Sequence, residues 1–144
     1  LKKSKTHDCQ IYYPLDVVVS KTLDGSGKIK EINEVNSDEM ILDIGPKTIA
    51  CIKNIVDESN TVLWNGPAGY FENPNFANGT KKILEIIADK RTKNKIYTVA
   101  GGGETVAVIN KFNKLDSFNF VSTAGGAFLE YLEGKELPGI KALN

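Results

Sequence analysis

The sequence is poor in cysteine, has no excess of either charge and contains no long apolar run. Its two cysteines, Cys9 and Cys51, are far apart and form no C-x-x-C pair, which argues against a disulfide framework and a metal or redox motif. Reduced thiols indicate a cytoplasmic protein. The 18 basic and 18 acidic residues give a formal net charge of zero, whereas general nucleic-acid binders carry a basic excess. No apolar run approaches membrane-spanning length, so we expect no nucleic-acid and no membrane partner.

Familiar catalytic and nucleotide-binding signatures are also missing. The only histidine, His7, lies in a charged terminal stretch with no nucleophile beside it, so we interpret it as a surface residue. No Ser-His-Asp, zinc or paired-carboxylate constellation occurs. The sequence contains neither G-x-G-x-x-G nor G-x-x-x-x-G-K-[ST], which excludes the usual dinucleotide and P-loop sites. The 144 residues, 41% hydrophobic and 25% charged, have the composition of one ordinary globular domain.

What the sequence does contain is one kind of junction used four times, in which an apolar, strand-like run ends in glycine and a helix-like pattern follows. The junctions span residues 41–46, 62–67, 97–103 and 120–126. Alternating strands and helices predict an α/β fold: a three-layer, mainly parallel, Rossmann-like sheet with helices on both faces. Right-handed crossovers would place all four turns on one edge of that sheet. Helix N-termini at this edge favour an anion, so the pattern predicts a phosphate site.

The remaining pattern predicts where the other elements lie. Strands are expected at residues 11–19, 41–44, 62–64, 96–100 and 118–121. Helices are expected from residue 46, over residues 75–90, through residues 106–112 and through residues 128–132. Residues 23–30 are polar and glycine-rich, which predicts a loop or hairpin. Pro138 is expected to mark an extended tail.

Residues 64–72 form an unusual connection, because they include two glycines, a proline and three aromatic residues. At the ligand edge, the aromatic atoms would form a flat pocket for a base, and Asn65 and Glu72 would bind hydroxyl groups. The alternative is a tight turn with aromatic residues in the core. The residues by themselves favour neither interpretation.

The run from Gly101 to Thr105 resembles a phosphate nest at a helix start, since three glycines allow successive N–H groups to point inward. Thr105 adds a hydroxyl, and Glu104 is within reach of a magnesium ion. The alternative is a helix with a favourable acid in its first turn. The junction at Ser122 and Thr123 reads most simply as a helix cap.

Three segments in order, W-N-G-P-A-G-Y-F-E, G-G-G-E-T and V-S-T-A-G-G-A-F-L-E-Y-L-E-G-K-E-L-P-G, resemble the C-terminal part of phosphoglycerate kinase. Residues 13–16 and 42–46 also fit, so the resemblance covers essentially the whole chain. It implies that residues 1–144 are a C-terminal portion of the nucleotide-binding domain and that the N-terminal substrate domain is absent. The family transfers a phosphoryl group between 1,3-bisphosphoglycerate and ADP, making 3-phosphoglycerate and ATP with Mg²⁺ in glycolysis.

The resemblance implies roles for five residues around the nucleoside. Asn65 would lie against the ribose and phosphates, and Glu72 would hold the ribose hydroxyls. The purine slot would be lined by Leu42, Pro67 and Tyr70.

It also implies a phosphate and metal site. The phosphates would be faced by Gly101, Gly102 and Gly103, with Thr105 beside them. Glu104 would face the magnesium. Gly125 and Gly126 would present helix N–H groups to the phosphoryl group in flight, which makes them and Gly102 the expected catalytic residues.

The sequence departs from the family at three positions. Glu104 replaces an aspartate, Ala124 replaces the first glycine of its turn, and Tyr70 replaces a small apolar residue. The lysine-bearing G-G-x-K-V-x-x-K segment of the nucleotide domain is not found. We therefore expect the chain alone to be inactive, with a non-catalytic remnant or a nucleotide-binding module as the alternative. ADP and ATP are the expected partners, and 3-phosphoglycerate only together with the missing domain.

Overall fold

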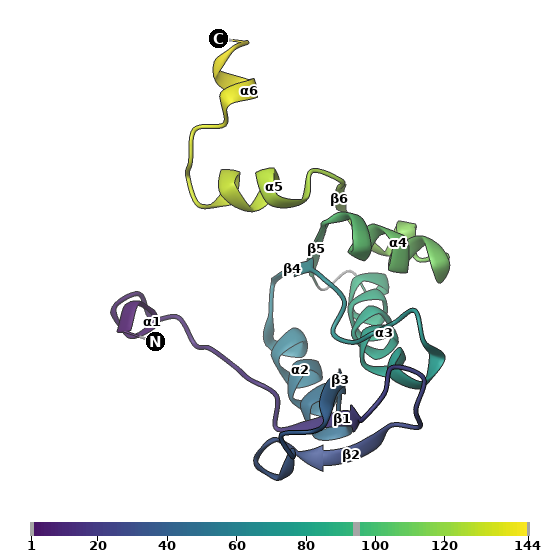
Figure 1. Cartoon of the computed structure of the whole chain (residues 1–144). Helices are drawn as coiled ribbons and strands as arrows, with labels where there is room; N and C mark the ends of the chain where they lie inside the picture. Colours follow the sequence, from purple (N-terminus) through teal and green to yellow (C-terminus); the bar gives the residue numbers. More distant parts are fainter. Residues whose placement is uncertain (1, 94–95, 144) are drawn as a thin grey trace.

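The computed structural model describes residues 2–93 and 96–143, and its described strands form two separate sheets (Figure 1). The parallel sheet has the order β4-β5-β6. Its strands are β4 (Thr61–Asn65), β5 (Tyr97–Gly101) and β6 (Phe120–Ser122). Each of these strands ends in one of the predicted glycine turns, and helices flank this sheet, so the α/β fold class is confirmed.

The second sheet is antiparallel and has the order β2-β1-β3. Its strands are β1 (Asp16–Ser20), β2 (Lys28–Glu31) and β3 (Met40–Ile44). The first glycine turn, at Gly45, therefore follows a strand of this other sheet, and the expectation that all four turns share one parallel sheet is wrong. An apolar run such as that of β3 pairs in either direction, because periodicity specifies the buried face and not the neighbour.

A register irregularity interrupts the pairing of β1 with β3. Val18 pairs with Asp43, and the next residue, Val19, pairs with Ile41, so the register with β1 skips Leu42. The carbonyl oxygen of Leu42 accepts a hydrogen bond from Tyr70 N at 2.8 Å. The bulge thus directs a backbone group of β3 toward the connection that follows β4.

The longer helices follow the predicted apolar spacing. They are α2 (Pro46–Glu58), α3 (Asn78–Thr92), α4 (Gly103–Lys111) and α5 (Gly125–Leu132). The short helices are α1 (Lys2–Thr6) and α6 (Pro138–Lys141), with 3₁₀ turns at η1 (Ile32–Glu34), η2 (Pro74–Phe76) and η3 (Leu115–Ser117). None of the helices in the described part of the chain is long and apolar enough to cross a membrane.

The core lies between the parallel sheet and the helices α3 and α4, with Ile44 of β3 reaching into it. Burial of these side chains is the main source of stability of such a layer. The buried cluster consists of Ile44, Trp64, Ile83, Leu84, Ile87, Ala100, Val108, Ile109 and Phe118. Helices α2 and α3 pack against each other beside it.

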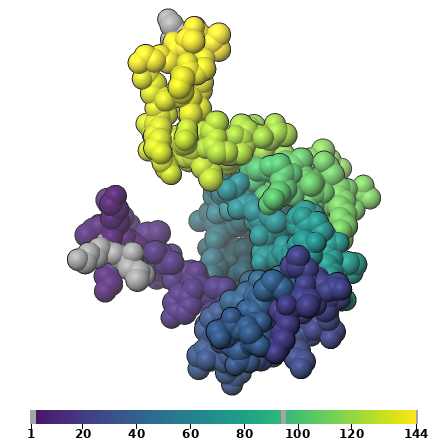
Figure 2. All heavy atoms as spheres, viewed as in Figure 1, coloured from purple at the N-terminus to yellow at the C-terminus, as the bar shows by residue number. Residues whose placement is uncertain are grey.

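Both ends of the chain project from this body (Figures 1 and 2). The strand expected at residues 11–19 is confined to β1, and residues 11–15 precede it as an exposed segment. Pro14 explains the late start, because proline cannot donate a ladder hydrogen bond. At the other end, the expected extended tail contains α6, which begins at Pro138, since proline suits a first helical position.

Candidate functional site

Three of the glycine turns meet at one edge of the parallel sheet. Asn65 at the end of β4 is in register with Gly101 at the end of β5, and Gly101 is in register with Ser122 at the end of β6. The turns at Gly66, Gly102 and the start of α5 therefore leave the sheet side by side. In open α/β sheets, ligands commonly bind at the carboxyl ends of the strands, which is this edge.

The turn after β5 is held in a conformation that favours glycine. Gly102 has a φ of 92°, its N–H donates to the Ser122 carbonyl oxygen at 3.2 Å, and its carbonyl oxygen accepts from Val106 N at 3.0 Å. A Cβ at this position would lie 2.9 Å from Oδ1 of Asn65. The Asn65 side chain thus lies over the triglycine turn.

The other glycines of the site differ in what surrounds them. A Cβ on Gly101 would lie 2.7 Å from the Phe128 ring, so this buried glycine permits α5 to pack against β5. A Cβ on Gly103, Gly125 or Gly126 would meet no atom within 4 Å. The backbone at the starts of α4 and α5 therefore borders open space, and helix N-termini in general favour negative charge.

Ala124 does not require a special backbone. Its φ is −74°, which any residue adopts, and its N–H donates to Ser122 Oγ at 3.2 Å. The departure from the family at this position therefore causes no backbone strain. Ala124 also lines an apolar hollow of about 260 Å³ together with Phe120 and Phe128.

Thr105, which the resemblance places beside the phosphates, lies next to the triglycine turn, with its hydroxyl oxygen 3.7 Å from where a Cβ on Gly102 would be. Its side chain is completely buried, and its hydroxyl oxygen accepts a hydrogen bond from Gly66 N at 2.7 Å. The hydroxyl thus joins the turn after β4 to the helix after β5 instead of facing the open surface. A threonine in a first helical turn reads as a local cap, so its link to a remote turn gave no signal in the sequence.

A second threonine, Thr80, is hydrogen-bonded to the connection after β4. This residue was not identified from the sequence. Ala68 N and Gly69 N both donate to the hydroxyl oxygen of Thr80, at 3.0 and 3.2 Å, and Thr80 is completely buried in α3. Tyr70 N donates to the Leu42 carbonyl oxygen. The N–H groups on this face of the loop are therefore paired inside the protein, which gives the loop a fixed shape.

The aromatic residues of this connection divide between the core and the accessible surface. Trp64 is buried and stacks on Phe118 with ring centroids 6.1 Å apart, so it belongs to the core. Tyr70 is 37% exposed, and Pro67 and Glu72 also retain accessible surface. Of the five expected nucleoside contacts, Leu42 is the one whose side chain is buried.

Asp43 of β3 is a buried carboxylate beside this loop. Its Oδ2 accepts from Gly79 N at 2.7 Å, and its Oδ1 accepts from Ile44 N at 2.9 Å. Burial raises the pKa of Asp43 above the ordinary value, and the hydrogen bonds from these N–H groups counteract only part of that rise. Sequence reasoning assigned no role to this residue, although it lies within the family motif at residues 42–46.

Asp16 of β1 has a similar position at the start of α2. Its carboxylate accepts from Lys47 N at 3.0 Å and from Thr48 N and Thr48 Oγ1, both at 2.8 Å. Burial by itself raises the pKa of Asp16, but these hydrogen bonds outweigh it, and the pKa lies below the ordinary value. Gly45 leaves room for this carboxylate, since a Cβ there would lie 2.3 Å from it.

The expected metal residue, Glu104, lies exposed in the first turn of α4. Within residues 2–93 and 96–143, no three His, Cys, Asp or Glu side chains gather into a metal cluster. Magnesium commonly binds through one or two carboxylates together with substrate phosphates. A single carboxylate at the edge of a phosphate turn fits that mode of binding and does not fit an all-protein metal cage.

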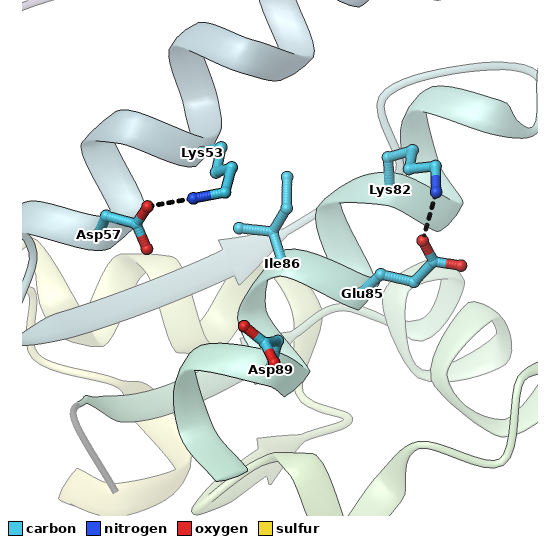
Figure 3. A pocket seen from close by; sticks show the side chains of 6 residues that line it. All are labelled: Lys53, Asp57, Lys82, Glu85, Ile86 and Asp89. Atoms are coloured by element: carbon cyan, nitrogen blue, oxygen red, sulfur yellow. Dashed lines mark hydrogen bonds and ion pairs between the residues drawn. The ribbon is translucent and has the colours of Figure 1, made fainter. Parts of the chain in front are cut away.

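A second hollow lies between α2 and α3, away from the glycine edge (Figure 3). Its charged residues form ion pairs, Lys53 with Asp57 and Lys82 with Glu85, while Asp89 pairs with Lys93. These charged groups pair with one another at an exposed surface, where ion pairs contribute little to stability.

Comparison with known proteins agrees with this geometry. The family model described as phosphoglycerate kinase matches residues 1–135. The chain is 43% identical to the phosphoglycerate kinase of Xanthobacter flavus and 47% identical to that of Francisella tularensis subsp. tularensis, in each case over 99% of this chain and 36% of the relative. It is similar to the solved structure of phosphoglycerate kinase from Coxiella burnetii, with a TM-score of 0.87 and 41% identity over 99% of this chain and 36% of that one. The chain thus spans about a third of the length of these relatives.

Proposed function

The chain belongs to the phosphoglycerate kinase family, and from this we propose that it forms a nucleotide-binding portion of such a kinase. In this proposal, residues 1–144 are the C-terminal part of the nucleotide-binding domain, and the domain that binds 3-phosphoglycerate lies outside this sequence. The ligand is ADP or ATP with Mg²⁺, and the family reaction is phosphoryl transfer between 1,3-bisphosphoglycerate and ADP.

One observation supports the nucleotide most directly: the ends of β4, β5 and β6 are in register at Asn65, Gly101 and Ser122. That register aligns a loop suited to a nucleoside with two helix starts suited to phosphates. A nucleotide has both parts joined by covalent bonds. An isolated phosphate would contact only the helix starts and would make no contact with the loop after β4.

Apart from the buried Leu42, the proposed nucleoside contacts follow the accessible surface of the site. Tyr70 and Pro67 would border the purine, with Leu42 below them, and Glu72 would accept hydrogen bonds from the ribose hydroxyls. Asn65 would bridge the ribose and the phosphates, because its side chain already lies over Gly102.

The phosphates would lie at the open helix starts. Gly103, Gly125 and Gly126 have free space where a Cβ would point, so the phosphate oxygens can approach their N–H groups closely. Gly102 provides the positive φ that the turn requires, and Gly101 leaves room for the Phe128 ring. Glu104 would hold Mg²⁺ together with phosphate oxygens, and the ion would neutralise phosphate charge.

The isolated chain is expected to bind the nucleotide without transferring the phosphoryl group. Transfer requires both reactants in line, and the residues that bind phosphoglycerate in the family are not in this sequence. The phosphate-binding lysine segment is also missing from the sequence. Each lost charge-assisted hydrogen bond weakens ADP binding by at least about tenfold, so the expected affinity is near millimolar. A nucleotide-binding module without catalysis is the alternative that the same contacts support.

Calorimetric titration of ADP into the purified chain tests the proposal. Glu72→Ala should weaken binding, because it frees the ribose, whereas Glu58→Ala, an exposed glutamate at the far end of α2, should not. Equal affinity of wild type and Glu72→Ala would contradict the placement of the ribose. A coupled assay with 3-phosphoglycerate, ATP and Mg²⁺ separates the kinase from the binding module, and turnover abolished by Gly102→Val would overturn the expected inactivity.

A further inference from the structure

The loop between β4 and α3, residues 66–77, carries the proposed purine and ribose contacts apart from Leu42 and Asn65. Its shape depends on what holds its two ends. The first end is joined to α3 through the hydroxyl of Thr80 and to α4 through that of Thr105. The second end leads directly into α3 at Asn78.

Both ends of the loop close on one carboxylate, that of Asp43. Its Oδ2 accepts the N–H of Gly79, the second residue of α3, at 2.7 Å. On the other side, Gly69 packs so tightly against it that a Cβ there would lie 2.4 Å from Oδ1. A Cβ on Gly79 would lie 2.2 Å from the same atom. Two glycines ten residues apart thus enclose a side chain that comes from the antiparallel sheet.

The start of α3 has no cap from its own sequence. The residue before the helix, Ala77, has no side chain that can accept a hydrogen bond, and none caps the helix there. Asp43 supplies the acceptor from β3, and the backbone of Asn78 also acts on its carboxylate. A negative charge at this position is stabilised by the helix dipole. The position of the helix start, and hence of the loop end, is therefore fixed from β3.

We infer that Asp43 is a positioning residue for nucleotide binding. Its carboxylate lies between Gly69 and the start of α3, and this contact holds the loop of residues 66–77 in its binding shape. Asp43 does not touch the nucleotide, since its side chain is 1% exposed. The inference rests on the proposed nucleotide function. A loop that is already ordered loses less conformational entropy on binding, so Asp43 contributes to affinity through the loop.

Asp16 provides a matched control within the same chain. It is also 1% exposed, it also lies on the antiparallel sheet, and it also accepts N–H groups at a helix start, those of Lys47 and Thr48 in α2. Helix α2 follows the turn at Gly45 and carries no part of the loop. Loss of Asp16 therefore removes an equivalent buried cap without releasing residues 66–77.

The experiment compares wild type with Asp43→Ala, Asp43→Asn and Asp16→Asn by amide hydrogen exchange without ligand, and then by ADP titration. Asp43→Ala should speed exchange at residues 66–79 by about tenfold or more and weaken ADP binding by about tenfold. Asp43→Asn keeps one acceptor oxygen and should give an intermediate effect. Asp16→Asn should speed exchange at the start of α2 and leave both the loop and the ADP affinity as in wild type.

Two results would overturn the inference: unchanged exchange at residues 66–79 in Asp43→Ala, or a loosened loop that binds ADP as tightly as wild type. If the Asp43 variants do not fold, Gly69→Ala tests the same contact from the loop side. Its Cβ would displace the loop from Asp43, so it should speed loop exchange and weaken ADP binding, and no effect would overturn the inference. Absence of ADP binding by the wild type would contradict the nucleotide function instead, while the exchange data would still decide whether Asp43 orders the loop.

Discussion

The hydroxyl oxygen of Thr105 accepts a hydrogen bond from Gly66 N at 2.7 Å, across 39 residues of sequence. This bond joins the turn that follows β4 to the helix that follows β5. The two parts of the proposed nucleotide site, the nucleoside loop and the phosphate turn, are therefore fixed relative to each other by a completely buried side chain. A change at Thr105 should affect both parts together.

Thr105→Val keeps the shape of the side chain but removes the acceptor, which leaves the N–H of Gly66 unpaired. We expect a loss of about 1–3 kcal/mol in the free energy of unfolding, together with weaker ADP binding. Thr105→Ser, which keeps the hydroxyl, should recover most of both. Urea unfolding monitored through Trp64, the only tryptophan, measures the first quantity. Thr61→Val, at an exposed position of β4, is the control, and an equal loss there would contradict the role of the hydroxyl.

Gly102 and Gly103 should respond differently to the same substitution. Gly102→Ala places a Cβ 2.9 Å from Asn65 Oδ1 in a backbone with a φ of 92°, so it should cost about 1–2 kcal/mol of stability. Gly103→Ala points its Cβ into open space, so its effect on stability should stay within about 0.5 kcal/mol. It should still weaken ADP binding, because the Cβ takes the space proposed for phosphate oxygens. Thermal unfolding and ADP titration of both variants separate the two effects.

Glu104→Asp tests the proposed magnesium contact. Shortening the side chain by one methylene moves the carboxylate by about 1.5 Å, and magnesium requires close to ideal octahedral distances. Because aspartate is the family's residue at this position, we expect the variant to strengthen ADP binding in the presence of Mg²⁺. It should leave ADP binding unchanged when Mg²⁺ is chelated. If Mg²⁺ makes no difference between variant and wild type, Glu104 serves only as a favourable acid at the start of α4.

Asp16 and Asp43 should affect stability with opposite dependence on pH. Burial tends to raise the pKa of Asp16 but hydrogen bonds lower it overall, so its stabilising contribution is present above the unfolded carboxyl pKa of about 3.9 and is lost as the pH falls through its folded value. Burial raises the pKa of Asp43, so the folded chain binds that proton more tightly than the unfolded chain does. The stabilisation from that proton is present below about pH 3.9 and is lost as the pH rises through the folded pKa.

The cost of Asp16→Asn should therefore shrink on acidification, and the cost of Asp43→Asn should grow. Urea unfolding of both variants and wild type between about pH 6 and pH 3 measures the two trends. Parallel pH curves for the two variants would contradict this assignment of the pKa directions.

The sequence by itself determined the α/β class, the three parallel strands with their helices, and the family. Apolar runs that end in glycine specify a strand, a turn and a helix locally, so β4, α3, β5 and α4 follow the predicted pattern closely. The family motifs at residues 64–72, 101–105 and 121–139 identify the family because their residues and order are unusual in combination. The junction pattern also predicted that the turns at Gly66, Gly102 and Gly125 leave one edge of the parallel sheet together, while the nucleotide contacts of Asn65 and of these glycines stay a prediction.

Only the tertiary structure decided which strands pair and which polar side chains hold the site together. The run at β3 is as apolar as a parallel strand, yet it pairs with β1 in a second sheet. Strand pairing depends on side-chain packing between residues that are distant in the sequence. Asp43, Thr80 and Thr105 look like ordinary cap or turn residues in the sequence. Each of them instead accepts a hydrogen bond from an N–H group 11 to 39 residues away, since N–H groups turned toward the interior must find an acceptor wherever the fold brings an oxygen.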